Sequence, residues 1–288
     1  MTDAAPSAAA ASRGKLIARR ALLYLAATLI FVWSASPFVW QFSTSFQLDK
    51  APTSGTPTLW PDPFTWEHYV NVFVDKQLQY YVLNSLIVSL STTFLCLAIG
   101  SLAAFSLSRL NVRGRYGILM VILSVSMFPQ ITLVGPLYIV ASSLGLLDTY
   151  TALILVYIAL VLPLVTWVMY GYFETLPREI DEAARMDGLH VVGLYWHIIL
   201  PMSLPSLVTT GLLAFITAWN EFLFALAFTS NIEHQTIPVG IANFTNLYYV
   251  PWGDIAAASA VVTAPLIVLV LVFQRHIIDG LTQGGIKE

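Results

Sequence analysis

Ionisable side chains are scarce in this sequence, so the places where they gather are the candidate sites of chemistry. Lys, Arg, Asp and Glu together make up 10% of the 288 residues. Two places stand out: a run of acidic residues within 175–188, and Asn220-Glu221 inside an otherwise apolar stretch. Carboxylates and amides there can form ion pairs and hydrogen bonds with a protein partner or a polar substrate.

Metal, redox and nucleotide chemistry have little support. His190 and His197 lie seven residues apart, and no His/Cys group has metal-ligand spacing. Cys96 is the only cysteine and is interpreted as a small core residue of an apolar run. Gly14-Lys15 lacks both the preceding glycine and the following Ser or Thr of a phosphate-binding loop. We therefore expect no catalytic residue, no metal and no directly bound cofactor.

The segment 175–188 has the features of a short helix. Pro177 suits a helix's first turn, where its missing N–H is not needed. Acidic residues near the start would interact favourably with the helix dipole: Glu179, Asp181 and Glu182. Gly188 can adopt the left-handed conformation that ends a helix. We predict a helix from about Pro177 to Asp187, followed by a second amphipathic segment over 189–200.

One face of this predicted helix is small and mildly apolar. Residues at i, i+3, i+4 and i+7 spacing form it: Ile180, Ala183, Ala184 and Asp187. The segment is either a solvated interfacial loop or a docking surface whose small residues let another protein approach closely.

Glu221 is the clearest charge inside an apolar run. An unpaired carboxylate in the middle of a bilayer costs at least about 2.5 kcal/mol, so this side chain should face a protein interior or a wet cavity. Small residues share its helical face: Ala214, Thr217, Ala218 and Ala225. Glu221, with Asn220 beside it, either lines a substrate pathway and binds hydroxyl groups, or forms a structural helix-to-helix hydrogen bond.

The elements that position these residues are membrane helices. Hydrophobic residues make up 57% of the chain, whereas a soluble domain usually carries about 25% charged residues, far above the 10% found here. Six apolar runs are each near the length of a bilayer crossing: 21–42, 81–107, 116–140, 152–172, 206–229 and 255–273. We predict an all-α polytopic fold of six transmembrane helices, with Pro129, Pro136, Pro163 and Pro265 as kinks.

The domain organisation follows from these runs. Residues 1–20 form a cytoplasmic tail whose first twelve residues we expect to be disordered, and 21–288 form one transmembrane domain. The first run could be a signal peptide cleaved near Ser34-Ala35-Ser36, but it continues far enough to span a bilayer, which favours an uncleaved helix.

Basic residues predict the orientation. With the amino terminus inside, eleven of the thirteen Lys and Arg residues fall in inside segments, and only Lys50 and Lys76 fall outside. The positive-inside rule therefore places both termini in the cytoplasm. Residues 173–205 then form an inside loop and 274–288 an inside tail, while 44–80 and 230–254 lie outside. Trp and Tyr residues near the outside boundaries form an interfacial belt or a partner contact: Trp60, Trp66, Tyr248, Tyr249 and Trp252.

The inside loop resembles a known family. Glu182-Ala183-Ala184 is followed by Gly188 and, after nine residues, by Ile198-Ile199-Leu200-Pro201. This pattern is similar at every fixed position to the EAA signature of importer permeases in the ATP-binding cassette (ABC) superfamily. Trp219-Asn220-Glu221-Phe222 and the ending 280–288 are similar to the maltose-type carbohydrate branch, specifically its shorter six-helix subunit. The resemblance covers residues 15–288 and implies the type I ABC importer permease fold.

The resemblance also implies roles for particular segments. The helix that holds Glu182, Ala183, Ala184 and Asp187 would be the coupling helix, which seats in a cleft of the nucleotide-binding subunit. Gly188 would form the turn that lets this helix project. The tail 280–288 would reach towards the ATPase dimer interface, and 230–254 would face the sugar-binding protein. The resemblance weakens the pathway interpretation of Asn220 and Glu221, because direct sugar contact would fall mostly to the partner permease.

Partners follow from the resemblance as well. The chain would pair with a second, different permease, two copies of an ATPase that binds ATP and Mg, and an extracytoplasmic sugar-binding protein, within the lipid of a bacterial inner membrane. No nucleic-acid partner is expected. A di- or oligosaccharide such as maltose or trehalose is the implied cargo.

Two other function classes compete with an ATP-driven importer. A secondary transporter powered by an ion gradient usually carries repeated halves and several intramembrane charges. A membrane-embedded hydrolase requires an acid, a base or a metal set inside the membrane. The sequence has no convincing repeat and no such set.

Overall fold

The structure is a computed structural model that describes residues 8–48, 60–246 and 248–283. Predictions for Lys50, for residues 1–7 of the amino-terminal tail and for 284–288 of the carboxy-terminal tail lie outside the described residues. Among the described residues no strand occurs, and a single isolated bridge joins Gln47 to Phe64. The all-α prediction is confirmed. The chain divides into two compact units, Met1–Val70 with Pro251–Ala260, and Asn71–Val250 with Val261–Glu288.

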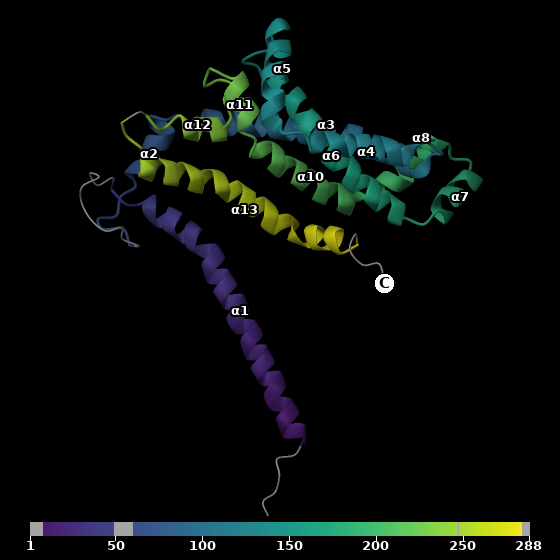
Figure 1. The fold of residues 1–288 in the computed structure, drawn as a ribbon, viewed down its shortest axis with the longest axis horizontal. Coiled ribbons are helices and arrows are strands. Elements are labelled where there is room, and N and C mark those ends of the chain that lie inside the picture. Colours follow the sequence, from purple (N-terminus) through teal and green to yellow (C-terminus); the bar gives the residue numbers. More distant parts are fainter. Residues whose placement is uncertain (1–7, 49–59, 247, 284–288) are drawn as a thin grey trace, which may run out of the picture. The chain divides into compact units, whose positions relative to one another are not determined.

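In the first unit, helix α1 runs over Ala8–Thr44 (Figure 1). It begins inside the segment predicted to be disordered, because its Ala-rich start favours a helix. Residues Arg19–Thr44 are long and apolar enough to cross a membrane, and no residue of their most apolar stretch is buried in the chain. An apolar helix of this length is typical of a membrane span.

The segment after α1 packs through aromatic rings. Phe46 stacks on Phe64 at a centroid distance of 4.7 Å and meets Trp66 edge-on at 4.9 Å. Helix α2 (Glu67–Val74) follows, and its His68 is buried against the first turn of α13 (Trp252–Gln283). His68 Nδ1 lies 2.7 Å from the Asp254 carboxylate, and Nε2 lies 2.8 Å from the Gln47 carbonyl oxygen.

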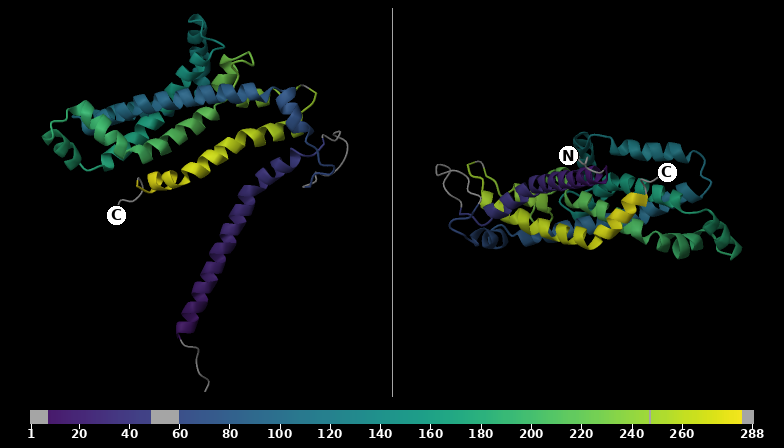
Figure 2. Two further views of the ribbon diagram at one scale, coloured as in Figure 1. Left: turned by 180° about the vertical axis from the view of Figure 1, so that it is seen from behind. Right: turned by 90° about the horizontal axis from the view of Figure 1, so that it is seen from below.

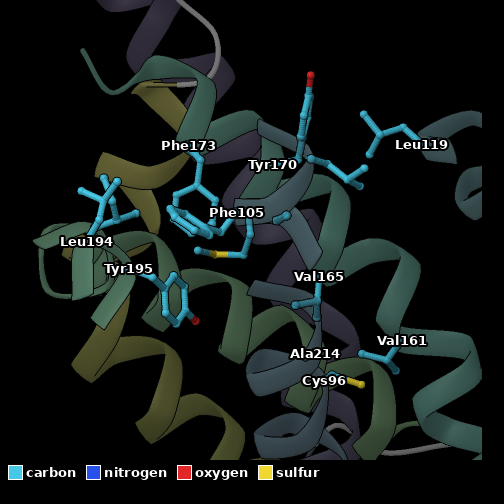
Figure 3. Close-up of a cluster of buried hydrophobic side chains, with 14 of the residues drawn as sticks. Cys96, Phe105, Leu119, Val161, Val165, Tyr170, Phe173, Leu194, Tyr195 and Ala214 are labelled. Carbon is cyan, nitrogen blue, oxygen red and sulfur yellow. The ribbon is translucent and has the colours of Figure 1, made fainter. Parts of the chain in front are cut away.

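The second unit is built around three helices that lie side by side: α3 (Leu78–Arg109), α6 (Tyr150–Thr175) and α10 (Leu204–Trp219) (Figures 1 and 2). Helices α3 and α6 approach closely at Gly100, where an added Cβ would lie 2.7 Å from Val165 Cγ1. Small residues allow such close helix contacts in membranes. The buried core includes Phe105, Phe173 and Tyr195, whose rings point towards one another (Figure 3).

The predicted third span, 116–140, is wrong as a single helix. The chain forms α4 (Arg115–Ser126) and α5 (Gln130–Ser143), which meet at an angle of 90°. Pro129 lies at the break, where it has no N–H to donate and disfavours helical geometry at the preceding residue. The expected kink at Pro129 is therefore a full break, whereas Pro136 lies inside α5.

The predicted fifth span, 206–229, is also wrong as a single helix. Helix α10 ends at Trp219, and α11 (Leu223–Phe228) begins after a short non-helical segment that contains Asn220 and Glu221. At its start, α10 meets the helical segment 191–202 at 78°. That segment consists of α8 (Val191–Leu194), the π-helix η1 (Tyr195–Ile199) and α9 (Leu200–Met202).

Two short helices complete the second unit: α7 (Glu179–Met186) and α12 (Ile237–Ala242). Four described helices are long and apolar enough to cross a membrane, or six if each bent pair counts as one span. The prediction of six spans therefore depends on how the two bent pairs cross the membrane.

Candidate functional site

Helix α7 forms the first candidate site, at one end of the second unit (Figure 1). It covers Glu179–Met186, close to the predicted 177–187, and its first turn holds three acidic residues. Gly188 has a φ of +84°, the left-handed conformation predicted for it. Its N–H donates to the Arg185 carbonyl at 3.0 Å, and the Leu189 N–H donates to the Ala184 carbonyl at 3.0 Å. The helix therefore ends where the sequence predicted.

The face by which α7 is exposed differs from the predicted one. Ala184 is only 2% exposed and belongs to the same buried cluster as Phe173 and Leu194. The exposed residues of α7 and of the turn after it are Glu179, Glu182, Ala183, Arg185, Met186, Asp187 and Gly188. Ala184 therefore anchors α7 to its own chain, and Met186, 87% exposed, supplies the apolar group on the outer surface.

A buried ion pair joins α7 to two long helices, and the sequence analysis missed it. Arg109, the last residue of α3, donates from Nη1 to Asp181 Oδ2 at 3.2 Å. Its Nη2 donates to the carbonyl oxygens of Phe173 and Leu176, at 2.7 and 2.8 Å, at the end of α6. The side chains of Arg109 and Asp181 are 1% and 8% exposed. The sequence offered two signals for this pair: an Arg at the end of one long apolar run, and an acidic loop after another apolar run.

The second candidate site is the break between α10 and α11. Glu221 accepts hydrogen bonds from the N–H groups of Phe224 (2.9 Å) and Ala225 (3.2 Å), the unpaired donors at the start of α11. The Asn220 side chain donates to the Ile216 carbonyl oxygen at 2.8 Å. Both of these donors are backbone groups of the adjoining helix, and the two alternatives for Glu221, substrate contact and a helix-to-helix hydrogen bond, stay predictions.

A cavity of about 380 Å³ opens at this break. Its polar lining comes from Gln130, Tyr157, Thr217, Asn220 and Glu221. The rest of the wall is apolar: Leu160, Val161, Ala218, Phe222 and Leu223. Asn220 and Glu221 thus share one cavity, and sequence reasoning missed Gln130 and Tyr157 because they come from other helices. Hydroxyl, amide and carboxylate groups around an apolar wall suit a polyhydroxylated ligand.

The Tyr157 hydroxyl stands out within this lining. Tyr157 is 1% exposed, and its hydroxyl has no partner at hydrogen-bonding geometry among the described residues. It lies close enough to the Glu221 carboxylate and the Thr236 hydroxyl to interact with both. A buried hydroxyl without a well-formed bond is costly, and a ligand or water in the cavity would satisfy it.

The other end of the second unit is tied by Asp148. Its carboxylate accepts from the Ser230 and Asn231 N–H groups at 3.0 and 3.2 Å and from the Asn231 amide. Burial acts to raise the pKa of Asp148, but these hydrogen bonds and His234 outweigh it and hold the pKa below its usual value. Two hydrogen bonds from the Asn84 amide to the Ile232 and Gln235 carbonyl oxygens, both 2.9 Å, secure the same loop. The segment 230–254 therefore begins as an anchored loop.

No group of three or more His, Cys, Asp or Glu side chains in the described part of the chain could hold a metal ion.

The ends of the second unit agree with the predicted alternation of inside and outside loops, since 176–190 meets the end of α3 and 229–237 meets the segment 144–149. Which end faces the cytoplasm stays a prediction.

The comparisons with known proteins cover nearly the whole chain. Residues 8–283 match the family model described as the binding-protein-dependent transport system inner membrane component. The chain is 42% identical to a trehalose/maltose transport system permease protein of Thermococcus litoralis, covering 94% of this chain and 98% of that one. It is 38% identical to a sulfoquinovosyl glycerol transport system permease protein of Agrobacterium fabrum (92% and 93%). It is 37% identical to a trehalose transport system permease protein of Mycobacterium tuberculosis (90% and 95%).

A solved structure shares the fold. A chain of a bacterial ABC transporter involved in the import of the acidic polysaccharide alginate matches with a TM-score of 0.76. The identity is 23%, over 94% of this chain and 99% of that chain. The chain therefore shares its overall fold with that chain of a bacterial ABC transporter.

Proposed function

Since the chain belongs to the family of binding-protein-dependent transport system inner membrane components, we propose that it forms half of the pathway by which a carbohydrate is imported. Members of this family are the non-catalytic permease subunits of ABC importers, and separate subunits hydrolyse ATP. This membership excludes the competing interpretations as an ion-driven secondary transporter or a membrane hydrolase.

The carbohydrate class is supported by the relatives and by the cavity. The similar permeases from Thermococcus litoralis and Mycobacterium tuberculosis serve trehalose or maltose systems. The cavity at the α10–α11 break offers amide, hydroxyl and carboxylate groups beside apolar carbon. These groups are complementary to a sugar, which carries hydroxyl groups and apolar C–H faces. This cavity is the observation that carries the proposal for substrate contact. Asn220 and Glu221 bind substrate hydroxyls there, together with Gln130, Tyr157 and Thr217.

The proposed assembly is a heterodimer of this chain and a second permease. Two ATPase subunits bind ATP and Mg on the cytoplasmic side, where both termini of this chain lie. An extracytoplasmic sugar-binding protein docks on the other side, and the complex resides in a bacterial inner membrane. A ligand shifts a two-state transporter only by binding its states differently, so the ATPase and the binding protein bias opposite states.

Helix α7 is the proposed coupling helix. Its outward surface, with Glu182, Ala183, Met186, Asp187 and Gly188, seats on the ATPase, while Ala184 holds the helix to the permease core. The exposed Met186 supports this role, because a flexible apolar side chain adapts to a partner's surface.

The test is uptake by the whole complex, purified through a tag on this chain and reconstituted into liposomes with ATP inside. We expect accumulation of labelled trehalose or maltose that needs internal ATP and the binding protein. Uptake of either sugar driven by an ion gradient without ATP would refute the proposal.

Substrate contact is tested separately at the cavity. Asn220→Ala and Tyr157→Phe should raise the sugar concentration needed for half-maximal uptake, while the amount of assembled complex stays the same. A matched control is Ser106→Ala, since Ser106 is a polar residue of α3 whose hydroxyl bonds only its own helix. Equal loss of assembled complex and of uptake in the cavity variants would make these residues structural.

A further inference from the structure

The strongest unassigned feature is the set of bonds around Arg109. The guanidinium meets three elements at once: it ends α3, it binds the last carbonyls of α6, and it pairs with Asp181 on α7. A guanidinium is planar and donates in fixed directions, so bonds to several partners define their relative positions. Arg109 therefore specifies where α7 lies relative to both long helices.

These bonds are poorly explained as a device for stability. Removing two charges from water opposes the gain from pairing them, and apolar side chains of similar size often stabilise a protein as well. Here, moreover, Arg109 Nε and Asp181 Oδ1 are buried without hydrogen-bond partners in the described part of the chain. A pair selected for stability alone would use these groups.

Further contacts make α7 and the two helices move together. Arg178, directly before α7, donates to the Ser108 carbonyl oxygen at 2.6 Å. Ala184 is buried with Phe173 of α6, and Gly100 lets α3 and α6 pack closely. The remaining face of α7 is exposed. A force applied to that face is therefore passed to α3 and α6 through Arg109, Arg178 and Ala184.

We infer that Arg109 and Asp181 are the positioning pair that transmits displacement of α7 to helices α3 and α6 during ATP-driven transport. This inference rests on the proposed function, since it assumes that an ATPase moves α7. In this inference the hydrogen bonds of the ion pair fix the direction in which α7 moves α3 and α6, and Ala184 anchors α7 by apolar packing.

The experiment measures sugar taken up per ATP hydrolysed, in the reconstituted complex with labelled trehalose or maltose. Asp181→Asn keeps the shape but loses the charge, and Arg109→Lys keeps the charge but loses the fork of donors. We expect both variants to assemble and hydrolyse ATP near the wild-type rate, while uptake per ATP falls about tenfold, within the usual range of coupling between sites. The matched control is Ser106→Ala, which removes a side-chain bond made within α3 to the Leu102 carbonyl oxygen and should leave the ratio unchanged.

A double variant separates positioning from folding. Arg109→Met with Asp181→Leu replaces the pair by apolar side chains, which should preserve the assembled complex but leave uptake uncoupled from ATP. Restored coupling in this variant would overturn the inference, as would a wild-type ratio in Asp181→Asn, or a parallel fall of assembly, hydrolysis and uptake. Absence of ATP-dependent uptake in the wild type would instead refute the proposed function.

Discussion

Asp181 and Glu221 are carboxylates of the same unit, and they are held by different kinds of partner. Asp181 is paired with the Arg109 guanidinium at the loop end of the helices. Glu221, inside the run predicted to cross the membrane, has no Lys or Arg within ion-pair distance among the described residues and is held by two backbone N–H groups of α11. One region fixes a carboxylate with a cation, and the other with the end of a helix.

The difference follows from the surroundings of the two regions. A cation brought to mid-membrane would itself have to be desolvated, whereas the N–H groups at a helix start are already present and carry partial positive charge. The break after Trp219 thus creates the partner that Glu221 needs. At the loop end an Arg is available, and its directional bonds also fix α7.

The largest effect is expected from breaking the cationic arrangement. Asp181→Ala leaves the Arg109 charge buried with only carbonyl partners, which should destabilise the complex by about 3 kcal/mol. The measurement is the thermal unfolding midpoint of the purified complex. Glu174→Ala, which removes exposed pairs only, should change stability by at most about 1 kcal/mol. Similar losses in the two variants would show that the Arg109–Asp181 pair is effectively solvated.

A smaller effect is expected from removing the helix-end partner. Glu221→Ala leaves the Phe224 and Ala225 N–H groups without their acceptor, at a cost of about 2 kcal/mol. Glu221→Gln keeps one acceptor oxygen and should lose about half as much. Hydrogen exchange at residues 223–228 would locate the change, and unaltered protection there in Glu221→Ala would argue against the capping role.

A substitution at Gly188 tests how firmly the end of α7, the helix that carries Asp181, is fixed. Gly188→Ala places a side chain at a φ of +84°, which should destabilise the end of α7 by about 1 kcal/mol. Gly171→Ala is the control, since Gly171 is exposed within helix α6 with open space beside it and should gain helix stability. Thermal unfolding of the two variants should shift in opposite directions, and a shared direction would contradict the assignment.

The smallest effect concerns Asp148, which is held by backbone N–H groups as Glu221 is, but near solvent. Because its pKa is lowered on folding, Asp148 contributes stability that is fully present above its ordinary pKa of 3.8 and is lost as the pH falls through the lowered value. Between about pH 5 and about pH 3, the wild type should therefore lose slightly more stability than Asp148→Asn. Equal acid sensitivity of both proteins would count against this role of the carboxylate.

Much of this architecture could be read from local patterns. The apolar runs, the acidic start of α7 and Gly188 after its end each report a property of neighbouring residues, and helix formation depends on such neighbours. The same patterns failed at Pro129 and at 220–222. Apolar composition continues across both breaks, because lipid and protein interior favour the same residues on either side of a bend.

Composition and periodicity by themselves determined a helical membrane protein, the position of the α7 helix and the two carboxylate-bearing segments as candidates. The tertiary structure decided that Ala184 faces inwards, that Arg109 meets Asp181, and that Gln130 and Tyr157 join Asn220 and Glu221 around one cavity. Each of these depends on residues far apart in the chain. Local patterns describe which side of a helix is apolar, but only the packed arrangement of α3, α6 and α10 determines what that side touches.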